Sequence, residues 1–465
     1  MKQSSQSHHH KRSLNVGDMT LFTVSAILLL DTLAASASIG VSSLFWWPLL
    51  ALVFFIPYGM ISSEMGTTYP EQGGIYAWVR DTFGKRWGTR VTWLYWLNNV
   101  LWSASVSVLF VGMFAALFWP EMSLMLKLGL AILLNWVIFF MTIQSLSIGK
   151  WIPNIGAILK MITFTSLIVA GIVFAINAPD QLANEFSWEA FTPQWASSSQ
   201  YISTIIYGML GFELMSSASE EMKNPKRDIP RSIFISGLLI FMAYFLGTFA
   251  ILAVVPVGEI DLVEGLIDTL RVVFGDSQLG SAAAMTLGLF ATFTFFSNIT
   301  TWCIGTNRSM AEAAKDGEMP NFLGKEHPVN GTPVGAAFFM VMMVTLVLIF
   351  YAMIAETNED LFWSLFAASA VLFLLPYIGT VAAFYRARQI DGDKERPYRV
   401  PGGNGFARLI TVTSIAMLSV CIFLFMYVPG QGFDWPVVIG SIASIILGEI
   451  AIRYAEHEAN KTEAS

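Results

Sequence analysis

The sequence predicts an all-α polytopic membrane protein with twelve transmembrane helices. The chain of 465 residues is 55% hydrophobic and only 13% charged, whereas a soluble domain carries about 25% charged residues. A chain this apolar lacks the polar surface that a water-soluble fold needs. Cys303 and Cys421 lie in separate apolar runs, so a disulfide framework is excluded.

Twelve runs are long enough to cross a bilayer, because about 20 mostly apolar residues span a hydrocarbon layer of about 30 Å. No loop between them is long enough to be a domain. We therefore predict one transmembrane domain at 17–455, with tails at 1–16 and 456–465. The expected spans are residues 17–41, 44–65, 90–118, 122–146, 153–177, 199–220, 231–255, 279–303, 334–355, 360–385, 406–428 and 435–454.

The positions of the basic residues predict the orientation in the membrane. All but three of the 26 Lys and Arg residues fall in the tails or in the even-numbered loops, the exceptions being Lys127, Lys160 and Arg271. The odd-numbered loops are acidic instead, as at Glu259 and Asp261. Basic loops stay in the cytoplasm. We therefore predict a multi-pass protein of the cell membrane with both termini in the cytoplasm.

The first expected span carries a carboxylate, Asp31, at its centre. Such acids usually face a cavity, because burying an unpaired carboxylate costs several kcal/mol. A run of small residues follows, which favours an opened helix with free backbone groups or, alternatively, tight helix packing. We predict that Asp31 and this run bind a ligand. The run is Ala34, Ala35, Ser36, Ala37 and Ser38.

The sixth expected span shows a similar pattern. Tyr207 comes directly before Gly208, and Gly211 is followed by the aromatic Phe212 and a buried acid, Glu213. Each glycine weakens a helix by about 1 kcal/mol relative to alanine, which helps a break to form. We predict a second binding stretch here, with Tyr207 as a lid that covers a cationic amine by cation–π attraction.

The two interrupted spans lie five helices apart. Inverted-repeat transporters place their broken helices at corresponding positions of two halves. The sequence therefore predicts a 5+5 inverted repeat at residues 17–177 and 199–385, with broken helices 1 and 6 and two extra helices at 406–454.

Polar residues in other spans are more ambiguous. The eighth span contains a polar run from which Asn298 is predicted to face the cavity, while about half of the run packs against neighbouring helices. Asn98, Asn99 and Asn135 permit either interpretation. Most aromatic residues are expected to face lipid or to anchor the interfaces, including Trp46, Trp47, Trp93 and Trp96. The polar run is Thr292, Thr294, Ser297, Asn298, Thr300 and Thr301.

Several motifs resemble those of the amino acid–polyamine–organocation superfamily, whose fold is LeuT-like, over nearly the whole chain. The segment at residues 69–79 resembles its glutamate/GABA-antiporter-like and polyamine-uptake branches. The other motifs are Gly211-Phe212-Glu213, Lys223-Asn224-Pro225-Lys226-Arg227-Asp228-Ile229-Pro230, the stretch from Arg308 to Pro320, and Arg396-Pro397-Tyr398-Arg399-Val400-Pro401-Gly402-Gly403.

The resemblance implies a substrate site between the open stretches of the first and sixth spans, closed by spans three, eight and ten. It implies that Tyr207 is a gating aromatic and that Glu213 takes part in proton-dependent gating. Lys160 matches a lysine that replaces a sodium ion, which implies sodium-independent transport. The chain departs from the family at Ala34–Ser38, where many relatives carry a G-x-G that holds a substrate carboxylate.

Each titratable residue also permits a structural role. Asp31 contacts a cationic group of the substrate, carries a proton, or forms a salt bridge with Lys160. Glu213 cycles a proton or braces the helix break with a hydrogen bond. Lys160 is a fixed cation or exchanges protons. These alternatives stay open at the level of the sequence.

The sequence therefore predicts a secondary active transporter, either an exchanger or a proton-coupled permease, for amino acids or small amines. Two buried acids favour cationic substrates such as agmatine, putrescine or basic amino acids. The alternative is a neutral or acidic amino acid antiporter that uses both carboxylates for protons. A channel is a distant alternative, since no selectivity-filter pattern is present.

An enzyme is not expected, because all five histidines lie outside the spans and no nucleophile–base set is visible. There is no phosphate-binding loop of the G-x-x-x-x-G-K-[ST] type, so ATP-driven pumping has no support. We expect no cofactor, no metal and no nucleic acid. The expected partners are the small-molecule substrate and the lipid bilayer, with the protein a monomer or a homodimer.

Overall fold

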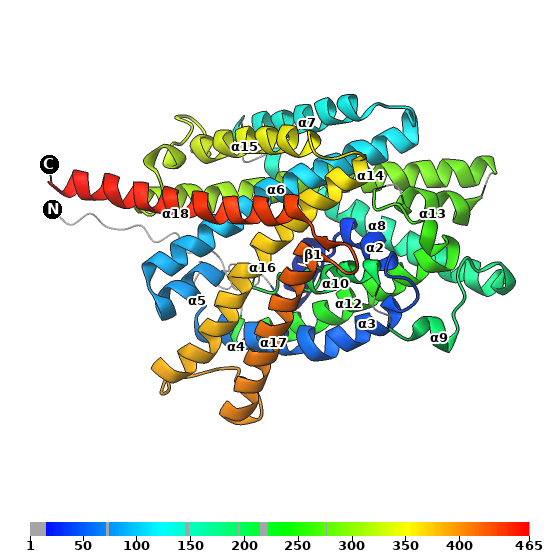
Figure 1. The fold of residues 1–465 in the computed structure, drawn as a ribbon. Helices are drawn as coiled ribbons and strands as arrows, with labels where there is room; N and C mark the ends of the chain where they lie inside the picture. The colour runs from blue at the N-terminus through cyan, green and yellow to red at the C-terminus, as the bar shows by residue number, and fades with distance from the viewer. Residues whose placement is uncertain are drawn as a thin grey trace.

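The computed structural model describes residues 15–70, 74–144, 148–193, 196–213, 222, 224–263, 265–275 and 277–464. Most of the long helices run between the same two ends of the molecule (Figure 1). The predictions made for 71–73, for 214–220, for Lys223 and for the first 14 residues lie outside the described part of the chain.

The described chain is helical apart from one small hairpin. Four short 3-10 turns and a π-helical segment interrupt or precede the α-helices. The elements are α1 (Val16–Ile27), α2 (Asp31–Ala37), α3 (Ser43–Leu50), η1 (Ala51–Phe55), α4 (Ile56–Thr68), α5 (Gly74–Phe83), α6 (Lys85–Phe118), α7 (Leu124–Gln144), α8 (Ile148–Asn177), η2 (Pro179–Gln181), α9 (Trp188–Phe191), η3 (Ser197–Tyr201), α10 (Ile202–Tyr207), α12 (Pro225–Val254), η5 (Val257–Glu259), α13 (Gly265–Phe274), α14 (Gln278–Lys315), η6 (Asn321–Gly324), α15 (Val334–Ala352), α16 (Asn358–Ile390), α17 (Gly403–Met426), β1 (Tyr427–Val428), β2 (Gly432–Phe433) and α18 (Trp435–Ala464).

Eleven of the twelve predicted spans are present in the described residues. Ten helices are long and apolar enough to cross a membrane, and α1 with α2 makes an eleventh span that is bent by 63°. The sixth predicted span is described only as η3, α10 and a turn that reaches Glu213. The prediction of an all-helical multi-pass membrane protein is confirmed.

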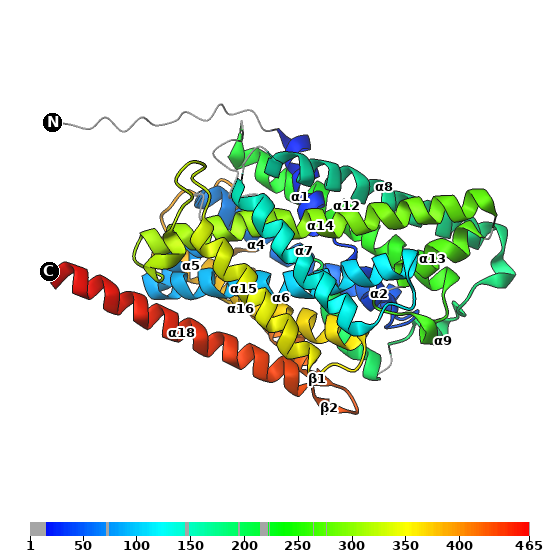
Figure 2. The same cartoon turned by 90° about the horizontal axis from the view of Figure 1, so that it is seen from above.

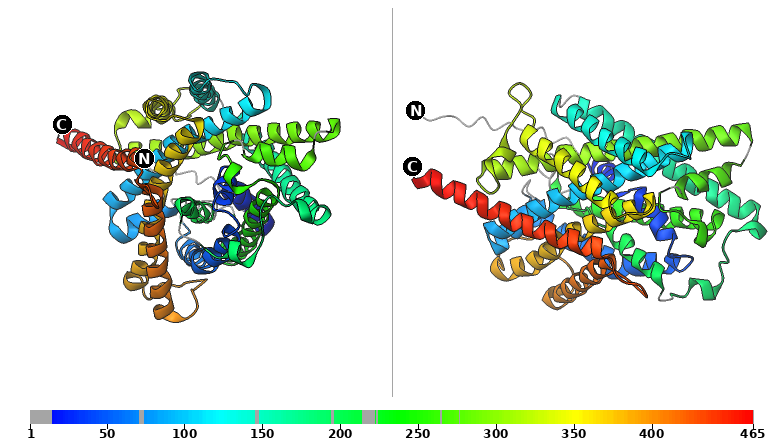
Figure 3. Two further views of the ribbon diagram at one scale, coloured as in Figure 1. Left: turned by 45° about the vertical axis from the view of Figure 1, so that its right-hand side comes forward. Right: turned by 45° about the horizontal axis from the view of Figure 1, so that its top comes forward.

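The core of the bundle is formed by α6 and α16, which pack along one another. In each of these two helices 83% of the most apolar 18-residue stretch is buried, whereas only 28% of the corresponding stretch is buried in α18. Figure 3 shows α17 and α18 at the edge of the bundle. Polar caps begin several helices. Asn15 accepts hydrogen bonds from the first turn of α1, for example, and Thr357 and Asp360 cap α16 reciprocally.

Two short helices were not expected from the sequence. The first, α5, connects the second and third spans, and α13 connects the seventh and eighth, five spans later. They lie at opposite ends of the bundle (Figure 1, Figure 2). Equivalent connections at opposite ends are what an inverted repeat produces. Both helices are too short to cross a bilayer, so the criterion of about 20 apolar residues does not predict them.

The prediction that Trp47, Trp93 and Trp96 face lipid or interfaces is wrong. Their side chains are 0%, 4% and 1% exposed. Each makes a specific contact inside the protein: Trp47 stacks on Tyr244 at 5.0 Å, and Trp93 donates a hydrogen bond to the Ser444 carbonyl. A buried indole is stable when its N–H finds an acceptor or its ring finds an aromatic partner.

Candidate functional site

The first span is broken immediately before Asp31. Helix α1 ends at Ile27 and α2 begins at Asp31, which leaves the backbone of 28–30 outside the helices. The buried hydroxyl of Tyr244, on α12, donates to the Ile27 carbonyl at 2.9 Å and accepts from the Leu29 amide at 2.8 Å. Backbone groups in a membrane need such partners, because no water is available there.

The break lies earlier than the small-residue run, so the predicted position of the open stretch is wrong. Residues 34–37 are helical and belong to α2. The Ser36 hydroxyl contacts the Leu33 carbonyl and Thr248, while the Ser38 hydroxyl donates to the Ala34 carbonyl. The run packs against α12, which is the alternative that small residues also permit.

The sixth span is interrupted opposite this break. Helix α10 ends at Tyr207, Gly208 follows it, and Gly211 has a φ of +124°. A Cβ at Gly211 would lie 2.7 Å from the Cγ1 atom of Ile27. The two interrupted stretches therefore touch, and only glycine allows this backbone conformation at this distance.

Asp31 is buried, with 3% of its surface exposed. Its Oδ2 atom accepts a hydrogen bond from the indole N–H of Trp102 at 3.1 Å. Its Oδ1 atom is buried and has no hydrogen-bond partner among the described residues. A carboxylate with a free oxygen is expensive to bury, which marks it as a site of interaction.

Lys160 does not form an ion pair with Asp31 among the described residues. Its ammonium group donates instead to the Ser25 carbonyl at 2.6 Å and to the Oδ1 atom of Asn298 at 3.1 Å. These partners lie on α1 and α14, so Lys160 connects the fifth span to the first and eighth, where the family resemblance places it. The alternative of an Asp31–Lys160 salt bridge is not realised in this structure.

Glu213 lies at the other side of the site and is 4% exposed. Tyr377 donates a hydrogen bond to its Oε1 atom at 2.6 Å, and Tyr58 donates to Oε2 at 3.2 Å. Two phenol donors from α16 and α4 therefore hold this carboxylate at the end of the interrupted sixth span. A phenol hydroxyl can donate a hydrogen bond to an ionised carboxyl group or accept one from a protonated carboxyl group, so these partners are compatible with both protonation states.

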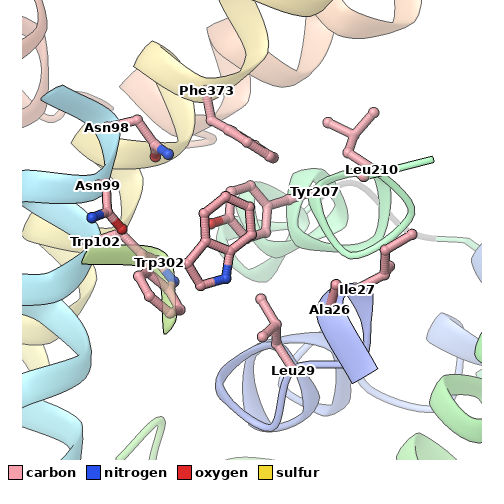
Figure 4. A pocket seen from close by; sticks show the side chains of 11 residues that line it. Ala26, Ile27, Leu29, Asn98, Asn99, Trp102, Tyr207, Leu210, Trp302 and Phe373 are labelled. Carbon is pink, nitrogen blue, oxygen red and sulfur yellow. The ribbon is translucent and has the colours of Figure 1, made fainter. Parts of the chain in front are cut away.

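A small cavity lies between the two breaks (Figure 4). Its volume is about 20 Å³, which holds about one water molecule. Leu29 lines it from the first break, Tyr207 from the sixth span, Trp102 and Asn98 from α6, and Trp302 from α14. Tyr207 is packed against Phe366 and Phe373 at 5.0 and 5.3 Å between ring centroids.

A larger cavity of about 670 Å³ adjoins the small one and shares Ala26 and Trp302 with it. It is lined by α1, α5, α6, α8 and α14, together with Glu213. The exposed residues Leu21, Phe22 and Ser309 belong to its rim, so it opens at the α5 end of the bundle. The protein is therefore open on the side of the basic loops and nearly closed at the two breaks.

A polar cluster borders the mouth of the large cavity. Tyr76 lines the cavity and donates a hydrogen bond to Glu318 at 2.8 Å, and Thr89 donates to the same carboxylate. Burial raises the pKa of Tyr76 to about 12, with Glu318 adding to the shift. The hydroxyl therefore stays protonated and remains a donor, which ties α5 to the loop after α14.

The structure brings together some of the predicted site residues and separates others. Tyr207 and Gly211 line the small cavity, Asn298 and Glu213 line the large one, and Asp31 lies behind Trp102. Neither cavity is lined by Gly208 or by residues 34–38. Of the polar run in α14, Ser297, Asn298 and Thr301 face the large cavity, while the other members donate to carbonyls of their own helix.

Sequence reasoning missed Trp102 and Trp302, whose rings meet edge to face at 6.1 Å. One signal was available for Trp102: it lies four residues after Asn98, so the two share a face of one helix. Trp302 follows the polar run of the eighth span at a similar helical spacing. Asn135 proved structural, since it donates to Ser107 and to the Ala131 carbonyl.

Comparison with known proteins assigns the chain to a family. The family model described as amino acid permease matches residues 14–448. The chain belongs to the amino acid permease family. This amino acid permease is therefore a multi-pass membrane transporter.

Three relatives align with this permease over most of their own length. A probable agmatine/putrescine antiporter of Lactococcus lactis is 32% identical over 95% of both chains. A probable polyamine transporter of Arabidopsis thaliana is 24% identical over 81% of this chain and 73% of its own. A glutamate/gamma-aminobutyrate antiporter of Lactococcus lactis is 22% identical over 90% and 84%. The superfamily resemblance is confirmed.

Proposed function

We propose that this permease exchanges small cationic amines, with agmatine and putrescine as the leading candidates. The observation that carries the proposal is the buried Asp31 carboxylate, which has one free oxygen and lies directly behind a wall of the cavity between the two helix breaks. An ammonium group inside a membrane needs such a counter-charge. The 32% identical relative named as an agmatine/putrescine antiporter supports the same substrate class.

The aromatic lining of the small cavity also supports a cationic substrate. Trp102, Tyr207, Trp302 and Phe373 come from four different helices and surround the space between the breaks (Figure 4). Aromatic faces attract an ammonium or guanidinium group by their quadrupole, more strongly where water is excluded. In this proposal Tyr207 covers the bound amine, while Gly211, Asn298 and Ser25 border the route to it.

Lys160 and Glu213 have separate roles in the proposal. The Lys160 ammonium group donates to the Ser25 carbonyl beside the first break, so a fixed cation takes the place of a sodium ion and transport is independent of sodium. Glu213, held by Tyr377 and Tyr58, couples the sixth span to α16 and α4 and is the candidate for proton-dependent gating. Substrate exchange then requires no metal or cofactor.

We place the permease in the cytoplasmic membrane with both termini inside. The basic loops support this orientation, because Lys and Arg remain on the cytoplasmic side. The large cavity then opens to the cytoplasm, and the structure corresponds to an inward-facing carrier. The transporter domain is 17–455, with repeats at 17–177 and 199–385 followed by two further helices.

A second candidate is a neutral or acidic amino acid antiporter in which both carboxylates carry protons. The 22% identical glutamate/gamma-aminobutyrate antiporter supports it. Counterflow in proteoliposomes distinguishes the two candidates: vesicles loaded with one unlabelled compound are tested for uptake of labelled putrescine, agmatine, glutamate or neutral amino acids. We expect counterflow with the two amines, and a much higher half-saturating concentration of both when Asp31 is replaced by Asn. Counterflow with glutamate alone would refute the cationic assignment.

A further inference from the structure

Trp102 separates the Asp31 carboxylate from the small cavity. Its side chain is 3% exposed, its ring lines the cavity, and its indole N–H lies 3.1 Å from the Oδ2 atom of Asp31. The ring also meets Trp302 edge to face. A ligand in the cavity therefore reaches Asp31 only if the Trp102 side chain moves.

The indole is the one side-chain donor to Asp31 among the described residues. Lys160 is committed to Ser25 and Asn298. The Thr32 hydroxyl donates to the Leu29 carbonyl instead. An ammonium group adds the attraction between opposite charges to its hydrogen bond, which a neutral indole N–H does not. An ammonium group of a ligand is therefore able to displace the indole.

The small cavity has no room for a carbon chain as it stands. About 20 Å³ is the space of a single water, so any bound substrate displaces a wall residue. Of the side chains that line this cavity, Trp102 is the one hydrogen-bonded to a carboxylate. Displacement of Trp102 therefore removes the indole donor from the Asp31 carboxylate and enlarges the small cavity at the same time.

We propose that Trp102 is a specificity-determining residue. Its indole N–H occupies the hydrogen-bonding position on the Asp31 carboxylate that a second cationic group of the substrate takes when it binds. The inference rests on the proposed function and deepens it. A diamine compensates for the lost indole hydrogen bond with an ammonium group. A monoamine of equal length leaves Asp31 without a side-chain donor, so the site discriminates against it.

The test compares putrescine with 1-butylamine, which has the same carbon chain and one amino group fewer. The Trp102→Phe variant keeps an aromatic ring at this position but lacks the competing N–H. We expect the half-saturating putrescine concentration in counterflow to fall about tenfold, as for the loss of a competing hydrogen bond to a charged group. The value for 1-butylamine should stay within about twofold, so the selectivity ratio rises.

Trp93→Phe is the matched control. Trp93 lies on the same helix, is 4% exposed, and donates its indole N–H to the Ser444 carbonyl away from both cavities. We expect this variant to keep the wild-type selectivity ratio. If Trp102→Phe changes transport of both amines equally, as a purely structural change would, the assignment of Trp102 is overturned.

Asp31→Asn provides a second route to the same answer if Trp102→Phe does not fold. It keeps the shape of the side chain and removes its charge, so the preference for putrescine over 1-butylamine should disappear. Adding Trp102→Phe to Asp31→Asn should then change nothing further. A wild-type protein that exchanges neither amine overturns the proposed function as well, whereas amine exchange by the wild type with an unaltered ratio in Trp102→Phe overturns only this inference.

Discussion

The hydroxyl of Tyr244 accepts a hydrogen bond from the backbone amide of Leu29, 215 residues earlier in the chain. The same hydroxyl donates to the Ile27 carbonyl, so one oxygen atom satisfies both sides of the break in the first span. Tyr244 itself is fully buried and is held by stacking on Trp47. The seventh span therefore stabilises the interruption of the first, and the interruption in turn positions Asp31.

Replacing Tyr244 by Phe should destabilise this break. The variant leaves one donor and one acceptor of the backbone buried without partners, and each such group costs about 1–3 kcal/mol. We expect a lower melting temperature in detergent and a lower maximal rate for every substrate, without a change in substrate preference. Tyr427→Phe is the control, because its hydroxyl makes no hydrogen bond among the described residues. Equal melting temperatures for the two variants would contradict the bridging role.

Gly211 should not tolerate alanine. Its φ of +124° is unfavourable for any residue with a Cβ, and that Cβ would lie 2.7 Å from Ile27. We expect Gly211→Ala to abolish most counterflow because the two breaks can no longer touch. Gly129→Ala, in α7 with nothing within 4 Å of the added atom, should be neutral or stabilising by about 1 kcal/mol. Wild-type counterflow by Gly211→Ala would show that this contact is dispensable.

A buried ion cluster joins the C-terminal part of α4 to α16. Glu64 is 0% exposed and accepts hydrogen bonds from the Nε and Nη2 groups of Arg388, from Arg396 and from the Val400 amide. Removing one partner of such a cluster leaves the other charges uncompensated, at a cost of about 3–5 kcal/mol. We expect Glu64→Gln to lower the melting temperature markedly, as measured in detergent.

The control for this cluster is an exposed ion pair in the same region. Lys226 and Glu395 lie 3.3 Å apart, and their side chains are 63% and 83% exposed. Exposed pairs contribute about 0–1 kcal/mol, so Lys226→Gln should hardly change the melting temperature. A larger effect from Lys226→Gln than from Glu64→Gln would show that burial does not determine the strength of these pairs.

Transport should be independent of sodium, with Lys160 essential. Lys160→Met leaves the Ser25 carbonyl and Asn298 without the ammonium donor, so the contact between the first and eighth spans is weakened. We expect equal initial rates of putrescine counterflow in sodium chloride and in N-methylglucamine chloride for the wild type. We expect little counterflow by Lys160→Met. A strong acceleration by sodium would reject the role of Lys160 as a fixed cation.

Much of the fold could be predicted because membrane spans are encoded locally. A helix such as α7 or α15 is recognisable from some 20 apolar residues in a row. The short helices α5 and α13 escaped this reasoning, since their polar faces resemble ordinary loops. The burial of Trp47 and Trp93 was also missed, because facing lipid and facing another helix demand the same apolar side chains.

The candidate site was predicted in part. The acids at positions 31 and 213 and the mid-span lysine stood out because charge is costly in a membrane. Trp102 and Trp302 did not stand out, because 15 tryptophans are present and composition alone does not separate cavity walls from anchors. The break was placed too late, at residues 34–38, because small residues can open a helix or pack it tightly.

By itself the sequence determined the membrane class, the run of spans, the separation of basic from acidic loops and the two interrupted helices, all of which depend on the composition of neighbouring residues. Only the tertiary structure decided where the first helix opens, that Asp31 pairs with Trp102 rather than with Lys160, and that Glu213 is held by Tyr377 and Tyr58. The physical reason is that a buried polar group takes whichever partner the packing of distant helices brings within hydrogen-bonding distance, and that packing is not a local property of the chain.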